Sequence, residues 1–466
     1  IAAAFLDLSR IQDNVCGYRQ KDGTYKVRES SITIASGTHE TCYIRMSGRI
    51  QVDLYNYFRR GYNLESYKLD HVAGHFIRNK VSSYKDGILS SKIDNVLQKG
   101  SYIHIEEIGH SSDYIDNGGK FKITDIDKEN GTMKIDRKDL QIDFNKKVMW
   151  CLAKDDVSPQ DIFRLTREGP MEKGIIAKYC IQDCNLVHHL LQKIDMITEF
   201  IEMANLCYVP IDFIVLRGQG IKLFSFISKQ CREIDTLLPV LTKGDNSGYE
   251  GAIVLQPKCG LYLDEPVACV DYSSLYPSSM ISENLSHDSK VWSKEYDLEG
   301  NLIREEGEKD ESTNTFVYDN LDHIDYVDVE FDTYRYVKKS ASVTHKVKVG
   351  KKKTRWAQFR DRKAILPTIL ETLLKARKNT RKQAKFKTVV TSIGSYSGII
   401  VKQDDDTKVV LQGDGLKVIE KESILSIEDT YDAFMKNVLD KRQLAIKVTA
   451  NSLYGQCGAR SEEHTS

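Results

Sequence analysis

The amino-acid sequence predicts a mixed α/β protein with more than one domain. At 466 residues the chain is longer than an ordinary single domain, so we expect two or three hydrophobic cores. Helical periodicity, as in "KYCIQDCNLVHHLLQKI", alternates with strand-like runs between glycine turns, as in "GGKFKITDI". The composition, 41% hydrophobic and 29% charged, is typical of globular proteins, and no apolar run reaches the roughly 18 residues of a membrane span. We therefore expect a soluble, intracellular protein with no membrane partner.

The N-terminal half predicts helices on either side of a small β insertion. The segment 48–77 predicts a strand followed by two helices. Short strand-like runs from about 84 to 150 predict the insertion. Helical periodicity then returns, with Ser158 as a predicted N-cap and Pro159 as the first helical residue, because a serine hydroxyl accepts from the free N–H groups of a first turn.

The C-terminal half predicts two helices with strands before and between them. The segment 248–278 predicts two strands around a turn. The segment 365–385 predicts a helix with an apolar stripe, and from Pro367 onward this helix is about 28 Å long. Residues 431–455 predict the last helix, and the β-like run 388–428 between the two helices predicts a second β insertion.

Asp271 follows the apolar run "PVACV", which predicts a buried central strand. An acid directly after such a strand is expected at the strand end, with its carboxylate in a cleft. Mg²⁺ binds one or two such carboxylates together with water and substrate phosphates. A simple strand-ending turn is the alternative for an isolated aspartate.

Two further elements supply groups that a triphosphate needs. Arg377 and Arg381 lie one turn apart on the helix 365–385, so both guanidinium groups can reach one polyphosphate. The last helix places a cation, an amide and an aromatic ring on one stripe, at Lys447, Asn451 and Tyr454. Together with the acid, these elements predict a metal-anchored triphosphate site. A solvated helix face and a core tyrosine are the alternatives.

The net charge is zero, but basic residues gather between Lys346 and Lys387, where only Asp361 and Glu371 interrupt them. Such a run predicts an anionic partner. A solvated charged face explains the run equally well.

These residues carry a resemblance to a known family. "DYSSLYPSSM" (271–280) resembles motif A of the family B DNA polymerases, and "KVTANSLYG" (447–455) resembles their motif B. "YEGAIV" (249–254) is similar to the linker between exonuclease and polymerase, and "YCIQDC" (179–184) to the third exonuclease motif. "RGQGIK" (217–222) is similar to the delta-type replicative branch, and the two β insertions resemble those of polymerases from large eukaryotic DNA viruses.

The resemblance implies a role for each matching residue. Asp271 binds the catalytic metals, two Mg²⁺ ions with Mn²⁺ as an alternative. The residues implied in holding the nucleotide are Ser274, Leu275, Tyr276, Arg377, Arg381, Lys447 and Asn451. Among these, Tyr276 excludes a ribose 2′-hydroxyl and Lys447 donates a proton to pyrophosphate. The residues implied in DNA contacts are Tyr249, Gly251, Tyr454 and Gly455. In the 3′–5′ exonuclease, Asp183 binds metal and Tyr179 orients the attacking water.

The implied domains are parts of larger ones. Residues 1–200 are expected to form part of an RNase H-like exonuclease, 201–359 the linker and the first part of a palm with a ferredoxin-like sheet, and 360–459 a helical fingers pair. Residues 460–466, "RSEEHTS", resemble the translation of a sequencing adapter, with a natural polar tail as the alternative, and are left out of the fold.

The resemblance also implies what this chain lacks. The second polymerase aspartate and the first two exonuclease motifs are not found in it, so we expect an inactive fragment of a replicative polymerase. The implied partners are primer–template DNA, deoxynucleoside triphosphates and a sliding clamp, in the host nucleus or a cytoplasmic viral factory. The alternatives are a non-catalytic DNA-binding paralogue and a protein that is chiefly an exonuclease.

Overall fold

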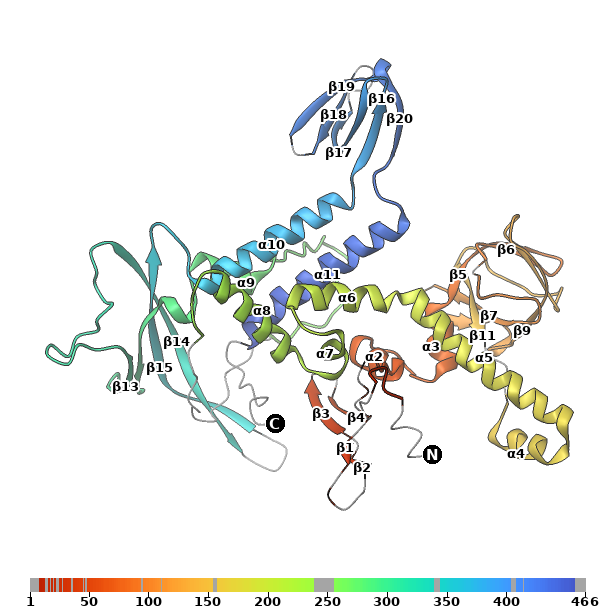
Figure 1. The fold of residues 1–466 in the computed structure, drawn as a ribbon, viewed down its shortest axis with the longest axis horizontal. Coiled ribbons are helices and arrows are strands. Elements are labelled where there is room, and N and C mark those ends of the chain that lie inside the picture. Colours follow the sequence, from red (N-terminus) through yellow and green to blue (C-terminus); the bar gives the residue numbers. More distant parts are fainter. Residues whose placement is uncertain are drawn as a thin grey trace. The chain divides into compact units, whose positions relative to one another are not determined.

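The computed structural model contains helices and sheets throughout, which confirms the predicted mixed α/β class (Figure 1). It describes residues 8–12, 16, 18–19, 21, 25–26, 28–34, 37–44, 46, 48–93, 95–109, 111–153, 157–238, 255–338, 344–403, 408–413 and 415–456. The chain divides into two compact units, Ile1–Thr198 and Glu199–Ser466. Among the helices of these ranges, none is both long and apolar enough to cross a membrane.

The first unit combines small sheets with helices. Its elements are β1 (Tyr18–Arg19), β2 (Tyr25–Lys26), β3 (Arg28–Ile34), β4 (Gly37–Tyr43), α2 (Leu54–Gly61), α3 (Leu69–Phe76), β5 (Arg78–Lys85), β6 (Ile88–Ser91), β7 (Tyr102–Ile108), β8 (Ser112–Tyr114), η1 (Ile115–Asn117), β9 (Phe121–Asp127), β10 (Thr132–Ile135), β11 (Lys147–Ala153), α4 (Pro159–Glu168) and α5 (Pro170–Ile194). The two helices predicted within 48–77 are confirmed, whereas the strand predicted before them is wrong. Residues 48–53 form no strand; Asp53 instead caps α2 by accepting from the N–H of Tyr55 at 2.9 Å.

Strands β5 to β11 form a closed barrel. The order β11-β5-β6-β10-β9-β7 returns to its start because β11 also pairs with β7, and β8 extends the sheet beside β7. Closure leaves few unpaired strand edges. The interior is filled by fully buried apolar side chains, namely Leu89, Ile103, Ile105, Phe121, Ile123, Met133, Ile135 and Trp150. The indole N–H of Trp150 donates to Ser91 Oγ at 2.9 Å, so the buried polar atom is satisfied. The barrel therefore has its own core.

Helices α4 and α5 follow the barrel. Ser158 caps α4 in a reciprocal capping box with Asp161, and Pro159 is the first helical residue, which confirms the predicted helix start. Helix α5 is 25 residues long and ends at Ile194; the next residue, Asp195, has a left-handed backbone that redirects the chain into α6. Residues of α5 line a cavity together with Tyr102 of β7 and with Leu152 and Ala153 of β11; α5 and the barrel are both labelled in Figure 1.

The second unit is built on a group of packed helices with two sheets. Its elements, the first of which begins just before the unit boundary, are α6 (Met196–Cys207), α7 (Ile211–Leu216), α8 (Gln219–Glu233), α9 (Leu275–Ser282), η2 (His287–Ser289), β12 (Lys290–Tyr296), β13 (Leu302–Gly307), β14 (Ile324–Lys338), β15 (Thr344–Phe359), α10 (Ile365–Gln383), β16 (Lys387–Thr391), β17 (Gly394–Gln403), β18 (Lys408–Gln412), β19 (Leu416–Glu420), η3 (Lys421–Ser423), β20 (Ile424–Asp429) and α11 (Ala433–Gln456). The two predicted helices 365–385 and 431–455 correspond to α10 and α11.

Helices α8, α10 and α11 share one hydrophobic core. The buried members of this core are Leu223, Phe226, Leu366, Ile369, Leu370, Leu373, Ile446, Ala450 and Leu453. Met280 and Ile281 of α9 pack against the same core. Each helix contributes residues three or four apart, so an apolar stripe faces inward and the polar faces of α10 and α11 stay accessible.

The start of α10 is capped by side chains that lie about 80 residues earlier in the chain. Asn284 Oδ1 accepts from the N–H of Ala364 at 2.8 Å, and Ser286 Oγ accepts from the N–H of Leu366 at 3.3 Å. The Asp288 carboxylate accepts from the N–H of Ile365. The first N–H groups of a helix have no partner within the helix, so these contacts hold α10 to the segment that follows α9.

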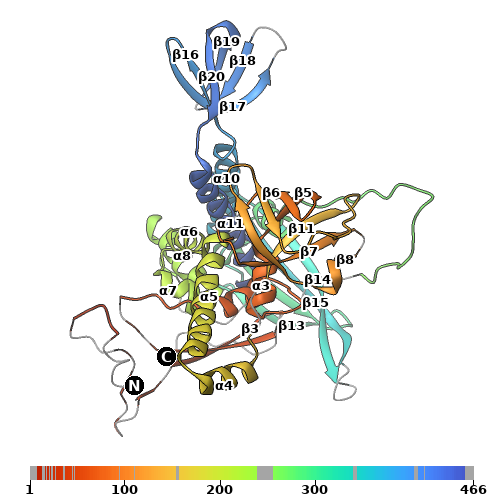
Figure 2. The ribbon, with the colours of Figure 1, turned by 90° about the vertical axis from the view of Figure 1, so that its right-hand side faces the viewer.

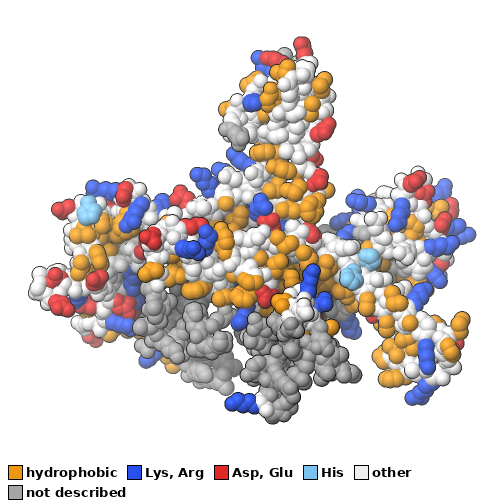
Figure 3. All heavy atoms as spheres, in the orientation of Figure 1, with side chains coloured by type: hydrophobic (Ala, Val, Ile, Leu, Met, Phe, Trp, Pro, Cys, Tyr) orange, Lys and Arg blue, Asp and Glu red, His pale blue; other side chains and the backbone are white. Residues whose placement is uncertain are grey.

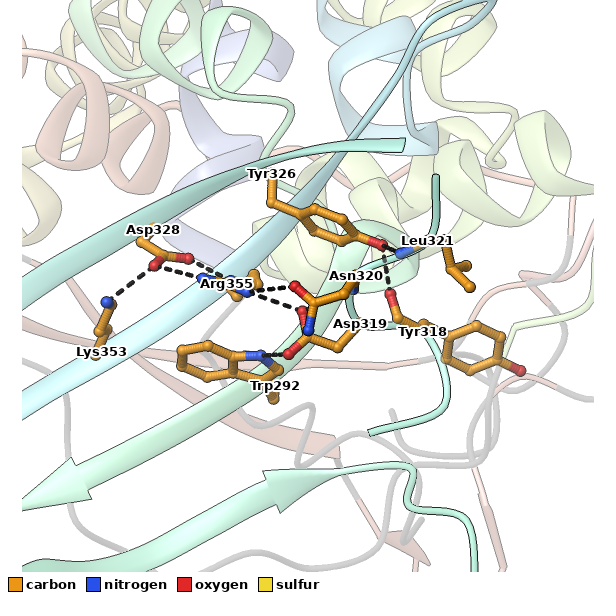
Figure 4. Close-up of polar contacts among 9 residues, drawn as sticks. All are labelled: Trp292, Tyr318, Asp319, Asn320, Leu321, Tyr326, Asp328, Lys353 and Arg355. Carbon is orange, nitrogen blue, oxygen red and sulfur yellow. Dashed lines mark hydrogen bonds and ion pairs between the residues drawn. The ribbon is translucent and has the colours of Figure 1, made fainter. Parts of the chain in front are cut away.

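A four-stranded antiparallel sheet, in the order β13-β12-β15-β14, lies between α9 and α10 in the chain. Basic residues of β15 face acidic residues across this sheet, and Arg355 bonds Asp328 and Asp319 at 2.6 and 2.9 Å (Figure 4). The other pairs are Lys348–Asp332, Lys351–Glu330, Lys352–Glu295 and Lys353–Asp328, at 2.7 to 2.9 Å. Along this part of the basic run the counter-charges lie within the chain, as the alternative of a solvated charged face predicts. The anionic partner stays a prediction.

A five-stranded antiparallel sheet, in the order β19-β18-β17-β16-β20, connects α10 to α11. Figure 2 shows it at the end of the helix pair, where α10 stops and α11 begins. Val389, Leu411 and Ile419 form its small core.

Residues 255–274 form no strand, so the buried strand predicted before Asp271 is wrong for this chain. Val267 and Val270 are 74% and 89% exposed. A strand requires hydrogen-bonded neighbours, and no strand of the described ranges pairs with this segment.

Candidate functional site

Helix α9 presents the tyrosine of the first motif. The chain enters α9 through Ser274, whose φ of +52° lies in the left-handed region that side chains with a Cβ rarely adopt. The Ser278 hydroxyl donates to the carbonyl of Ser273 at 3.0 Å and holds this turn. Leu275 and Tyr276 then form the first turn of the helix, and Tyr276 stays 45% exposed.

Tyr276 stacks on Tyr454 of α11. The two ring centroids lie 4.5 Å apart and the ring planes are inclined by 11°. Stacked rings at this separation stabilise each other beyond the area that they bury. The structure thus brings together two residues 178 positions apart, one from each sequence motif. Gly455 follows Tyr454 in α11, with open space at the position of a Cβ.

Arg377 is linked across the helix pair to a residue that the sequence analysis did not identify. Its Nε–H donates to Oε1 of Gln443 at 3.2 Å, and Nε2 of Gln443 donates to Asp440 at 3.1 Å. Gln443 lies one turn before Lys447 on the same face of α11. The hydrogen bond therefore holds the Arg377 guanidinium of α10 next to the stripe of α11 that carries Lys447 and Asn451. The i, i+4 spacing of Gln443 and Lys447 was the sequence signal that could have placed Gln443 on the same helix face.

The accessible face of the helix pair is rich in cations. Burial lowers the pKa of Arg377, and the nearby Arg381 lowers it further, so two guanidinium groups lie close enough to repel each other. Arg381, Lys447 and Asn451 are exposed. Lys375, Lys378, Arg381, Lys382 and Lys447 form no ion pair with any carboxylate in the part of the chain that the structure describes. This face can therefore attract a polyanion.

Helix α11 is anchored on its other side by ion pairs with α6. Arg442 donates through two nitrogens to the Glu202 carboxylate at 2.7 and 3.1 Å, and Lys441 lies 3.4 Å from Glu199. Glu202 is only 8% exposed, and its carboxylate raises the pKa of Arg442. A bidentate pair of this kind fixes orientation as well as distance. The sequence analysis missed these residues because they lie 240 positions apart.

Asp271 is exposed four residues before α9 begins. Carboxylate oxygens are among the ligands that Mg²⁺ prefers, so Asp271 fits as one ligand of such an ion. Two-metal chemistry requires at least two carboxylates. Within the described ranges, no group of three or more His, Cys, Asp or Glu side chains gathers in a way that could hold a metal. Asp271 is thus an exposed single carboxylate, and its role in a metal site stays a prediction.

Tyr179 and Asp183 lie one turn apart on α5 and line a cavity of about 140 Å³ between α5 and the barrel. The cavity wall on the barrel side includes Gln98, Ser101 and Tyr102. The two residues predicted for the exonuclease therefore share a pocket with the β insertion, an arrangement that the sequence did not indicate. Tyr249 and Gly251, predicted to contact DNA, lie outside the described residues.

On the face seen in Figure 3, hydrophobic side chains gather over α10 and α11, with Lys and Arg side chains among them. Phe434 and Met435, near the start of α11, are 63% and 39% exposed. The helix pair thus offers both cations and apolar surface.

Two family models match the chain. The model described as DNA polymerase family B matches residues 209–392 and 421–463, and the model described as DNA polymerase family B, exonuclease domain, matches residues 8–72. The polymerase model contains both motif segments and omits residues 393–420, which carry much of the five-stranded sheet. Neither model matches residues 73–208, which carry the barrel, Tyr179 and Asp183.

Curated relatives match over nearly the whole chain. The chain is 46% identical to a DNA polymerase of Phaeocystis pouchetii virus over 98% of its length, and 41% identical to a DNA polymerase of Pyramimonas orientalis virus over 92%. It is 27% identical to the DNA polymerase delta catalytic subunit of Candida albicans over 91%. The chain spans 40%, 32% and 26% of the lengths of these three relatives.

Proposed function

The chain belongs to the family B DNA polymerases, and we propose that it works as part of a longer replicative enzyme that adds deoxynucleotides to a primer 3′ end. The observation that carries this proposal is the stack of Tyr276 on Tyr454, which joins the motif A and motif B segments. The exposed cations of α10 and α11 support it, since a triphosphate needs several positive groups in its reach.

In the proposed reaction, the primer 3′-hydroxyl oxygen attacks the α-phosphorus in line. A new P–O bond forms while the bond from the α-phosphorus to the bridging oxygen breaks, and pyrophosphate leaves. Arg377 and Arg381 hold the β- and γ-phosphates, backbone groups of Ser274 and Leu275 align them, and Lys447 donates a proton to the pyrophosphate. These residues act by positioning and by stabilising charge, with no covalent intermediate on the protein.

Family B DNA polymerases generally depend on divalent metal ions. We propose Mg²⁺, with Mn²⁺ as an alternative, and Asp271 as one of its ligands. When bound, such ions neutralise phosphate charge and lower the pKa of the attacking hydroxyl. A further carboxylate is required, and we place it outside the described residues.

Tyr276 is proposed as the sugar gate. Because its ring is stacked on Tyr454, it has a defined position and can exclude a 2′-hydroxyl by steric contact. Tyr276→Ala should therefore raise ribonucleotide incorporation, whereas Tyr276→Phe keeps the ring and should not. Single-nucleotide incorporation with dNTP and rNTP pairs measures this ratio. Unchanged sugar discrimination in the alanine variant would remove Tyr276 from the gate.

Tyr179 and Asp183 are proposed to belong to a 3′–5′ exonuclease in the same enzyme. The exonuclease-domain match at residues 8–72 supports this activity, although it covers neither residue. Asp183 would hold a metal ion, and Tyr179 would orient the attacking water.

Primer extension by the full-length gene product tests the proposal. The intact protein should extend a labelled primer with dNTPs and Mg²⁺, and Asp271→Ala should abolish incorporation while primer–template binding stays near the wild-type level. A protein that trims 3′ ends but extends no primer would instead be chiefly an exonuclease. One that binds DNA with neither activity would be a non-catalytic paralogue.

The expected partners are primer–template DNA and deoxynucleoside triphosphates, as for any member of the family. A sliding clamp is a further proposal, supported by the similarity to delta catalytic subunits. The similarity to viral polymerases supports a location in the host nucleus or in a cytoplasmic viral factory.

A further inference from the structure

The cavity between the barrel and α5 has two walls of different origin. One wall is a single face of α5, where Tyr179, Gln182 and Asp183 lie within about one turn of each other. The other wall comes from the inserted barrel, and neither family model matches either wall. Any ligand in this cavity therefore touches both the predicted exonuclease residues and the barrel.

The barrel wall is held by a tight turn. The N–H of Gln98 donates to Ser101 Oγ at 3.1 Å, and the N–H of Ser101 donates back to the carbonyl of Gln98 at 3.0 Å. The turn also pairs with β9, because the N–H of Gly100 donates to the carbonyl of Ile123 at 2.8 Å. Gly100 has a φ of +92°, which favours glycine at this corner. Gln98 and Tyr102 are therefore held at the cavity by local backbone geometry.

Tyr102 has a strand neighbour on each side. It opens β7, where it pairs with Lys122 of β9 and with Ala153 of β11. The Lys122 ammonium lies 5.9 Å from the centre of its ring. Tyr102 and Tyr179 thus supply one aromatic ring from each wall of the cavity.

The lining chemistry suits a nucleobase better than a phosphate. No Lys or Arg is among the described residues that line the cavity, so a phosphate fits there only beside Asp183, where the proposed metal ion would balance its charge. The walls offer aromatic rings, apolar side chains and the amides of Gln98, Gln182 and Asn185. Aromatic rings stack on any base, and amide groups bond the donors and acceptors of base edges.

We propose that this cavity binds the unpaired terminal base of a single-stranded DNA 3′ end, and that Gln98 and Tyr102 of the inserted barrel position it for trimming. The inference rests on the proposed exonuclease and deepens it, because it assigns part of substrate binding to the inserted barrel. Tyr102 and Gln98 are positioning residues that contact the base, while Asp183 and Tyr179 act at the phosphodiester.

The test measures 3′ trimming of a labelled single-stranded oligonucleotide by the full-length protein. Base stacking is worth roughly 1–3 kcal/mol per base, so Tyr102→Ala should raise KM about tenfold with kcat within twofold of wild type. Tyr102→Phe keeps the ring and should retain the wild-type KM. Tyr114→Ala removes a tyrosine from the same barrel that does not line the cavity, and it should leave trimming unchanged. Gln98→Ala should raise KM about threefold. Because Gln98 is exposed, this variant can replace Tyr102→Ala in the test if Tyr102→Ala does not fold.

An oligonucleotide whose terminal nucleotide lacks its base separates base contact from a structural effect. On this substrate, wild type and Tyr102→Ala should show the same high KM. An equal KM for wild type, Tyr102→Ala and Gln98→Ala on normal DNA, with trimming abolished in Asp183→Ala, would overturn this inference and leave the exonuclease proposal standing. Normal trimming by Asp183→Ala would overturn the exonuclease proposal itself.

Discussion

Most basic residues of β15 form ion pairs with acidic residues of β14 and β12, whereas those of α10 have no acidic neighbours in ion-pair contact within the described ranges. Both belong to one basic run in the sequence. On β15, Arg355 bonds two carboxylates, and the pKa of Asp328 falls to about 2 chiefly because Arg355 donates to it. On α10, the neighbour that acts on Arg377 is another arginine. A count of charges along the sequence therefore does not distinguish cations that stabilise a sheet from cations that await a ligand.

The largest effect is expected at Lys447, on the helix that packs against α10. Lys447→Ala removes the proposed proton donor to pyrophosphate, and it should lower kcat of the full-length enzyme about 1,000-fold, or roughly 4 kcal/mol. Single-turnover primer extension measures it.

Lys436 provides the matched control for Lys447. It lies on the same helix but pairs with Asp429, so Lys436→Ala should change kcat by less than twofold. Similar losses in both variants would show that α11 needs positive charge in general and has no special donor at Lys447.

A smaller effect on KM is expected when the cations of α10 are compared directly with those of β15. Arg381→Ala should raise KM for dNTPs about 30-fold, because it removes a charge-assisted contact to the triphosphate, worth about 2 kcal/mol. Lys351→Ala on β15 should leave KM within twofold, since Lys351 is already paired with Glu330 at 2.8 Å. Steady-state kinetics on one primer–template compares the two variants, and an equal rise in KM would contradict the distinction between α10 and β15.

The paired charges of β15 predict a pH dependence of stability. The pKa of Asp328 is about 2 in the folded chain against 3.8 ordinarily, so the unfolded chain binds its proton first as the pH falls. The contribution of Asp328 is therefore present above pH 4 and lost between pH 4 and 2, and solvent screening limits it to about 1 kcal/mol. Urea unfolding followed by tryptophan fluorescence should show this loss in wild type and less of it in Asp328→Asn. An identical pH profile for both proteins would refute the prediction.

The smallest effect is expected at Gln443, which orients Arg377. Gln443→Ala should raise KM for dNTPs about fivefold, since one neutral hydrogen bond contributes about 1 kcal/mol. Gln443→Glu keeps an oxygen acceptor for Arg377 and should lie closer to wild type than the alanine variant. If both variants match wild type, Arg377 holds its position without Gln443.

Segments with strong local signals were predicted well. The capping box at Ser158 and the helices α10 and α11 follow from residue spacing, because helix formation and capping depend on residues within a few positions. The strand before Asp271 was predicted wrongly, although "PVACV" has the composition of a strand. A strand depends on neighbours elsewhere in the chain, and composition alone carries no information about whether they are present.

The sequence by itself determined which helices form, which of their faces carry Arg377, Arg381, Lys447 and Asn451, and which family the motifs resemble. Only the tertiary structure decided that Tyr276 stacks on Tyr454, that Gln443 holds Arg377, and that the barrel lines the cavity beside Asp183. The physical reason is the range of the interactions. Helical periodicity and capping act within one or two turns, whereas stacking, ion pairing and cavity formation join residues that only the fold brings together.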